Sequence, residues 1–149
     1  MKRVKRSALV PYSNEQMFDI INDVRAYPQF LPWCAGSRVL SETEDELVAT
    51  LEIARSGMSQ RFTTRNQLFR PESMTLELVD GPFTALSGEW HLLALGNDGC
   101  KVSMQLRFEF SSRIMNMTFG SVFNVAADQM VDAFCRRAEK VYGVAGRLS

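Results

Sequence analysis

Residues 102–110 alternate without interruption between apolar and polar side chains. One side of this segment is apolar throughout and consists of Val102, Met104, Leu106, Phe108 and Phe110. The other side is polar and consists of Ser103, Gln105, Arg107 and Glu109. A period of two predicts a β-strand whose faces meet different environments. The chain therefore needs a sheet with one buried face and one exposed face.

Six further segments show the same period of two. They span residues 2–10, 36–41, 47–53, 61–69, 74–78 and 86–92. Turn-forming residues separate neighbouring segments, and Gly96-Asn97-Asp98-Gly99 is the strongest of these hairpin signals. The last six strands are therefore expected to form an antiparallel meander.

Residues 13–24 carry the first helical pattern. Ser13 stands three residues before Gln16, the arrangement of a capping box, and apolar residues follow at helical spacing as far as Val24. Prolines between Tyr27 and Trp33 limit the next segment to a turn or a short second helix.

The longest helical pattern lies near the C-terminus. It begins after Ser111 or Ser112, either of which can cap a helix, and ends at Gly143. Its apolar stripe consists of Phe119, Phe123, Ala126, Met130, Phe134 and Val141. Gly120 interrupts this helix and indicates a kink or a place of close packing.

Only the C-terminal helix is long enough to cover the apolar face of the meander. We therefore expect an α+β fold in which a curved antiparallel sheet grips this helix, as a single domain over residues 1–149. A helix laid across a curved sheet can leave a cavity where large and small side chains alternate. An ordinary packed core is the alternative, and the pattern alone leaves both open.

Groups that could perform catalysis or bind a metal are few. Cys34, Cys100 and Cys135 are too far apart for a zinc pair or a disulfide framework, which predicts reduced thiols. His91, the only histidine, has the opposite parity to Trp90 and is expected on the surface. No nucleophile elbow or phosphate-binding loop is present. We therefore predict that the protein is not an enzyme and has no metal site.

Positive charge is concentrated locally although the net charge is zero, with 17 basic and 17 acidic residues. The predicted basic surface consists of Lys2, Arg3, Lys5, Arg6, Arg55, Arg61 and Arg65. Such a surface would attract the phosphates of RNA or lipid, while the alternative is ordinary solvated charge. For a nucleic-acid contact, the acidic loop Glu42 to Glu46 should lie away from it. The zero net charge gives no general attraction to DNA.

No apolar stretch in the sequence approaches the length of a membrane span, and the run after the basic N-terminus stops at Pro11. This predicts a cytoplasmic protein and leaves peripheral membrane contact open.

Two segments carry a resemblance to a known family. They run from Asp23 to Cys34, including Tyr27-Pro28-Gln29-Phe30-Leu31-Pro32-Trp33, and from Leu78 to Trp90, including Asp80-Gly81-Pro82. The chain resembles, over nearly its whole length, the polyketide cyclase/START-like family of coenzyme-Q-binding proteins, and most closely the bacterial ribosome-association toxin branch. The resemblance implies a helix-grip fold, a hydrophobic cavity and no catalysis.

The resemblance also implies two functions. Members of the bacterial branch are described as binding the large ribosomal subunit and blocking its association with the small subunit, and we expect this activity here. The alternative is a carrier of ubiquinone or another lipid that supports respiratory electron transfer, as in mitochondrial relatives. No cofactor is expected to be tightly required; ubiquinone or another isoprenoid lipid is the candidate ligand. A cyclase-type enzyme is disfavoured because inward acid and base residues are missing.

The predicted ligand cavity combines the inward strand and helix residues with the first family segment, which the resemblance places at the cavity mouth. Its residues are Tyr27, Phe30, Leu31, Trp33, Leu51, Phe62, Leu76, Phe83, Trp90, Met104, Leu106, Phe108, Phe119, Phe123 and Met130. Trp33 is also a second candidate for partner contact, as an exposed aromatic residue.

Overall fold

The computed structural model describes residues 1–55 and 57–143. The elements are β1 (Lys2–Val10), α1 (Asn14–Asn22), the 3-10 helix η1 (Val24–Ala26), α2 (Tyr27–Phe30), β2 (Cys34–Glu42), β3 (Glu46–Arg55), β4 (Met58–Phe69), β5 (Ser73–Asp80), β6 (Phe83–Leu95), β7 (Gly99–Phe110) and α3 (Arg113–Tyr142). The domain predicted over residues 1–149 includes positions 56 and 144–149, which lie outside the described residues.

All seven strands pair antiparallel in one sheet with the order β1-β7-β6-β5-β4-β3-β2. The meander β2 to β7 is therefore confirmed, and β1 joins it at β7, where Lys2 pairs with Phe108 and Val10 with Cys100. The strand β6 is longer than its alternating segment predicts, because β7 pairs with it from Phe83 to Leu95.

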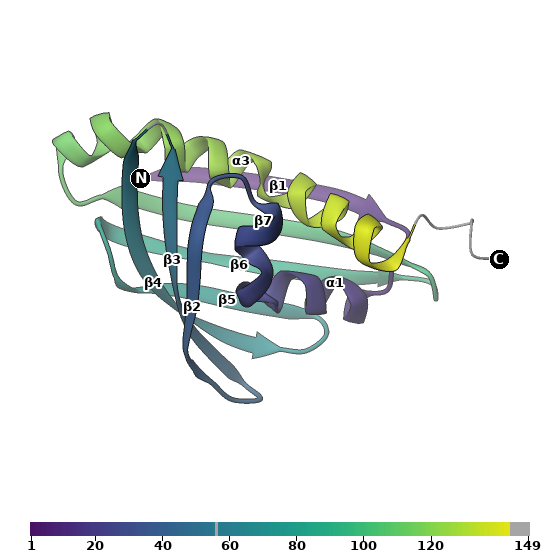
Figure 1. The fold of residues 1–149 in the computed structure, drawn as a ribbon. Helices are drawn as coiled ribbons and strands as arrows, with labels where there is room; N and C mark the ends of the chain where they lie inside the picture. The colour runs from purple at the N-terminus through teal and green to yellow at the C-terminus, as the bar shows by residue number, and fades with distance from the viewer. Residues whose placement is uncertain (56, 144–149) are drawn as a thin grey trace.

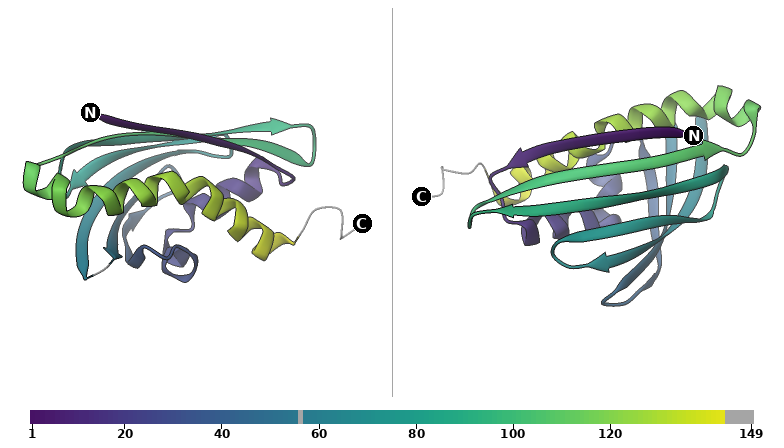
Figure 2. Two further views of the ribbon diagram at one scale, coloured as in Figure 1. Left: turned by 90° about the horizontal axis from the view of Figure 1, so that it is seen from above. Right: turned by 180° about the vertical axis from the view of Figure 1, so that it is seen from behind.

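The sheet is curved, and the helices lie on its concave side (Figure 1). Seen from above, α3 crosses the hollow of the sheet, and α1 and α2 lie beside it (Figure 2, left). The view from behind shows the outer face of β1, β7, β6 and β5, with the helices behind the sheet (Figure 2, right). The predicted arrangement, a curved sheet gripping a long helix, is confirmed.

The helix α3 begins and ends at the predicted caps. Ser112 Oγ accepts a hydrogen bond from the Met115 backbone N–H at 3.0 Å. At the other end Gly143 has φ 85°, and its N–H donates to the Glu139 carbonyl at 2.8 Å. A Cβ at Gly120 would lie 2.8 Å from Asn116 Oδ1, the end of an exposed side chain that can move aside, and α3 runs uninterrupted through this position. Val141 departs from the predicted stripe, because it is 49 % exposed.

The helix α1 begins with the predicted capping box. Ser13 Oγ accepts from the Gln16 backbone N–H at 3.1 Å, and Gln16 Oε1 accepts from the Ser13 N–H at 2.9 Å. The prolines do not prevent a helix in the following segment, since Pro28 occupies the first turn of α2, where no backbone donor is needed.

Candidate functional site

An apolar cavity of about 80 Å³ lies between the concave face of the sheet and α3. Many of the residues predicted to surround a ligand line it, namely Tyr27, Trp33, Leu51, Phe62, Leu76, Trp90, Met104, Leu106, Phe123 and Met130. They come from α2 and the residues after it, from β3 to β7 and from α3, and they meet because α3 packs across the inner face of the meander. Their role as ligand contacts stays a prediction.

The structure does not bring the remaining predicted cavity residues to this cavity. They are Phe30, Leu31, Phe83, Phe108 and Phe119. Most of them pack against other aromatic rings instead: the Phe108 ring centroid lies 4.6 Å from that of Phe123, and the Phe83 centroid 5.0 Å from it. The alternation in the strands predicts which side chains point inward, but it does not separate a cavity wall from the packed core behind it.

The cavity has further lining residues that were not in the predicted set of ligand contacts, although the alternation and the helical stripe place many of them on the inward side. They are Ile21, Val24, Ala49, Ile53, Thr64, Asn66, Met74, Leu86, Ala126 and Ala127. The strand residues among them could have been found by parity, because Ala49 and Ile53 alternate with Leu51 as inward residues. Thr64 and Asn66 share the parity of Phe62, so the alternation places them on the same side of the strand, but as polar residues they were left out of the predicted apolar wall.

The first family segment has buried and exposed residues: Tyr27, Leu31 and Trp33 are buried, while Pro28 and Pro32 are exposed. Trp33 is 4 % exposed, so the expectation of an exposed aromatic contact is wrong. The Tyr27 hydroxyl donates to the Ile21 carbonyl, and its ring centroid lies 5.4 Å from that of Phe134 in α3. The segment therefore joins α1 to α3 and closes one side of the cavity.

Burial also keeps the titratable groups near the cavity neutral. It raises the pKa of the Tyr27 phenol, with further contributions from Cys34 and Asp23. Burial raises the pKa of the Cys34 thiol to about 11, and it raises the pKa of Cys100 and Cys135 as well. Because the thiolate is the nucleophilic form, these cysteines are poorly suited to covalent chemistry at neutral pH.

Two polar features distinguish the cavity from an entirely apolar core. Thr64 Oγ1 donates to Asn66 Oδ1 at 3.0 Å, which pairs two of its polar groups. In contrast, the buried Trp33 Nε1 has no hydrogen-bond partner within the described part of the chain. The cavity wall is therefore apolar with a few polar groups.

The predicted basic surface is partly neutralised by acids. Arg61 Nη2 lies 3.8 Å from Glu52 Oε1, Arg65 Nε lies 3.5 Å from Glu46 Oε2, and Arg6 Nη2 lies 2.5 Å from Asp128 Oδ1. These contacts lower the local excess of positive charge that a phosphate would meet.

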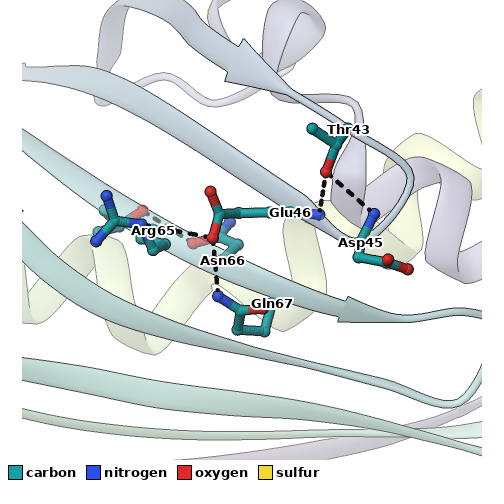
Figure 3. Close-up of polar contacts among 7 residues, drawn as sticks. Thr43, Asp45, Glu46, Arg65, Asn66 and Gln67 are labelled. Carbon is teal, nitrogen blue, oxygen red and sulfur yellow. Dashed lines mark hydrogen bonds and ion pairs between the residues drawn. The ribbon is translucent and has the colours of Figure 1, made fainter.

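Glu46 lies at the centre of one such contact (Figure 3). It faces both Arg65 and Gln67 of β4, and Gln67 Nε2 donates to Glu46 Oε2 at 3.0 Å. Thr43 Oγ1 holds the preceding loop by accepting from the backbone N–H of Asp45 and of Glu46. The predicted separation of the acidic loop from the basic surface is therefore wrong for Glu46, because the β3–β4 pairing places Glu46 against Arg65, a residue of that surface.

A second group of basic residues lies on the outer face of β1, β7 and β6. Lys5, Lys101 and His91 line one depression of this face together with the hydroxyl residues Ser7 and Ser103. All three basic side chains belong to exposed residues, as predicted for His91. Within residues 1–55 and 57–143, neither lysine forms an ion pair. Lys101 was missed because it is isolated in the sequence and joins Lys5 only through strand pairing.

Glu89 and Arg107 form a two-point ion pair on the same outer face, with distances of 3.0 and 2.7 Å. The hydrogen bond from Arg107 is the main cause that holds the pKa of Glu89 below its ordinary value of 4.5. The folded state therefore binds fewer protons than the unfolded state, and stability is lost as the pH falls through this lowered pKa.

Glu89→Gln is expected to destabilise the domain by about 1 kcal/mol at neutral pH and to flatten the acid side of its stability profile. Urea unfolding between about pH 3 and pH 7 measures both effects. Glu109→Gln is the matched control, since Glu109 is an exposed β7 residue without an ion pair within the described ranges. Equal profiles for the wild type and Glu89→Gln would contradict the assignment.

No group of three or more potential metal ligands occurs among the described residues. None of the helices in the described part of the chain combines the length and apolar character needed to cross a membrane.

Comparisons with known proteins agree on a single family. The model of the family "Polyketide cyclase / dehydrase and lipid transport" matches residues 10–135. A protein of Vibrio cholerae named "Ribosome association toxin RatA" is 50% identical over 143 residues, which cover 96% of this chain and 99% of that protein. A more distant relative, the mitochondrial "Coenzyme Q-binding protein COQ10 homolog B" of Xenopus laevis, is 30% identical over 148 residues, covering 95% of this chain and 61% of that protein.

A solved structure agrees as well. The Zhui aromatase/cyclase of Streptomyces sp. R1128 superposes with a TM-score of 0.83 at 17% identity, covering 97% of this chain and 98% of that one. This likeness concerns the fold alone. The chain has the START-like helix-grip fold and belongs to the polyketide cyclase / dehydrase and lipid transport family.

Proposed function

We propose that the protein is a non-enzymatic, RatA-type protein that binds the large ribosomal subunit and inhibits subunit association. The observation that carries this proposal is the 50% identity to a ribosome association toxin over 96% of the chain. The compared length spans the strands that form the outer face as well as those that form the cavity wall.

The outer face offers a contact for RNA. Lys5 and Lys101 are exposed and, within the described residues, free of ion pairs, so their charges are available for phosphates. Each lysine that neutralises a phosphate releases a counterion, which gives salt-dependent affinity. A chain with zero net charge can use this effect only where its cations are segregated from its acids.

The cavity chemistry supports a binding role over catalysis. Among the described residues that line the cavity, Tyr27 alone carries a titratable group. Its hydroxyl is engaged with the Ile21 carbonyl, and burial raises its pKa, so it is a poor acid or base at neutral pH. The wall therefore offers surface for binding and little for proton transfer.

Sedimentation of ribosomal subunits tests the proposed function. Protein incubated with large subunits before small subunits are added is expected to lower the peak of joined ribosomes and to raise the free-subunit peaks in a sucrose gradient. The protein itself should co-sediment with the large subunit, because that is the proposed partner. Incubation with the small subunit alone is the control. Absence of co-sedimentation at low salt, with an unchanged gradient, would exclude this function.

The cavity favours a second function, the binding of an apolar ligand. A dry apolar cavity of roughly 150 Å³ can hold benzene, so about 80 Å³ requires some side chains to move before a larger molecule enters. Met74, Met104 and Met130 line the cavity, and their unbranched side chains can adopt other rotamers at low cost. Titration calorimetry with small apolar molecules tests this function, which is compatible with ribosome binding, and absence of binding by any of them would exclude it.

A further inference from the structure

Three leucines at one end of the outer sheet face are exposed to solvent. Leu9 of β1 is 72 % exposed, and Leu93 and Leu95 of β6 are 61 % and 45 % exposed. Their neighbours in sequence, Val10 and Leu92, are buried on the inner side. Because successive side chains of a strand point to opposite faces, the three leucines point outward.

Strand pairing brings these leucines together. Lys101 of β7 pairs with Leu9 on one side and with Leu93 on the other. Side chains paired in this way on one face of an antiparallel sheet have Cβ atoms about 4.5–5.5 Å apart. Leu95 lies on the same side of β6 as Leu93, and its partner Gly99 has no side chain to cover it. Leu9, Leu93 and Leu95, with Lys101 between them, form what we call the leucine patch.

The described part of the chain leaves the leucine patch uncovered. The helices lie on the other side of the sheet, and the outer face of β1, β7 and β6 is open (Figure 2, right). Single exposed leucines are common on soluble proteins, whereas neighbouring ones that form a continuous surface indicate a contact with another molecule. The leucine patch is therefore a candidate interaction surface.

The leucine patch is continuous with the proposed RNA contact. Lys101 belongs to the patch and also lines the depression that contains Lys5 and His91. Within residues 1–55 and 57–143, neither lysine forms an ion pair. A partner that covers the whole face must therefore present phosphates beside an apolar surface. A ribosomal subunit offers both, because its RNA and its proteins lie side by side.

We propose that the leucine patch packs against an apolar surface of a protein of the large ribosomal subunit, beside the RNA that Lys5 and Lys101 contact. The inference rests on the ribosome-binding function proposed above and names the class of molecule that this part of the face meets. RNA is a poor partner for leucine, because its bases stack on aromatic or arginine side chains and its backbone is charged. A protein surface supplies aliphatic groups that can bury leucine.

The charges of the face disfavour a second copy of the chain as the partner. A two-fold contact of the leucine patch with itself would place the Lys101 side chains of the two copies close together. Like charges repel, and no acid of the described residues neutralises Lys101. The patch therefore fits a different protein better than its own copy.

The double variant Leu9→Thr/Leu93→Thr tests the inference by co-sedimentation with intact large subunits. It is expected to weaken association about tenfold, because two apolar contacts are lost. The slope of log affinity against log salt should stay that of the wild type, since no phosphate contact is removed. Threonine suits an exposed strand position, and circular dichroism confirms that the variant is folded.

The matched control is Leu40→Thr/Val79→Thr, which changes two aliphatic residues that are 51 % and 48 % exposed on β2 and β5. It is expected to bind like the wild type. Wild-type affinity of the leucine-patch variant would overturn the inference and leave ribosome binding intact. A reduced salt slope in that variant would also overturn it, by showing that phosphate contacts were lost. No association of the wild type with large subunits would overturn both the inference and the proposed function.

Photocrosslinking identifies the molecule that the leucine patch meets and leaves most of the patch unchanged. A benzophenone amino acid in place of Leu93 reacts on irradiation with C–H bonds nearby, and it is expected to join the chain to a protein of the large subunit. The same amino acid in place of Val79 is the control and should give no such product. Products at position 93 that contain only RNA or a second copy of this chain would overturn the inference, as would the absence of any product from bound protein.

Discussion

Reversing the charges of Lys5 and Lys101 to glutamate is expected to weaken association with large ribosomal subunits by about tenfold or more at low salt. Both lysines line the same depression of the outer face, and neither is neutralised by an acid in the described part of the chain. Each phosphate contact contributes about one to the slope of log affinity against log salt. Co-sedimentation at several salt concentrations should therefore show a slope smaller by about two in the double variant.

The matched control reverses Arg61 and Arg65, which are also exposed but lie within 4 Å of Glu52 and Glu46. Since these arginines are paired within the sheet, their reversal is expected to weaken ribosome association less than the lysine reversal. Circular dichroism confirms that both double variants are folded. A larger loss from the arginine variant would place the contact on β3 and β4 and contradict the assignment to β1, β7 and β6.

Phe134→Ala is expected to destabilise the domain by about 3–5 kcal/mol and to lower its melting temperature by about 10 °C. Phe134 is fully buried in α3, and its ring centroid lies 5.4 Å from those of Tyr27 and Trp90 and 5.8 Å from that of Phe30. Truncation leaves a hole where α2, the sheet and α3 meet. Calorimetric and urea unfolding measure the loss.

Phe69→Ala is the control for Phe134→Ala, because Phe69 is 57 % exposed at the end of β4. It should change the free energy of unfolding by only about 0.5 kcal/mol. A loss below about 1 kcal/mol for Phe134→Ala would show that the aromatic contacts between the first family segment and α3 contribute little.

Much of the fold was predictable because alternation reports directly on which side of a strand is buried. The inward residues Met104, Leu106 and Phe108 of β7 are buried as predicted. Predicting the ion pairs of Arg61 and Arg65 requires the strand register in addition to the alternation. In the β3–β4 hairpin Arg55 pairs with Met58, and this places Glu52 opposite Arg61. The tight turn alone could therefore have predicted that contact.

Burial of the first family segment was harder to predict. Its prolines and closely spaced aromatic residues show neither a period of two nor a helical period, so no exposed side can be assigned from the sequence. Its environment is set by α3, which begins far along the chain and supplies Phe134. Aromatic residues in such a segment can be exposed residues that contact a partner or buried residues of the core. Only the tertiary packing decides between these two environments.

The glycine at position 81 shows how the residue required in a turn depends on the core packed against it. Gly81, in the second family segment, has φ 152°, and a side chain there would bring its Cβ within 2.6 Å of Phe62 Cβ. Phe62 lines the cavity, so the β5–β6 turn requires glycine partly because of what packs beneath it. The sequence predicts the turn correctly. The requirement for glycine comes from Phe62, on the neighbouring strand β4.

The pairing of β1 with β7 has a consequence for the order in which the domain can fold. Strands β2 to β7 each pair with a neighbour in the chain, so they can assemble through successive short loops. In contrast, β1 must close a loop that contains the whole meander before Lys2 meets Phe108, and such distant pairings slow folding. During synthesis β1 therefore emerges first and waits longest for its partner. Until β7 is complete, β1 remains an unpaired strand that another chain could bind.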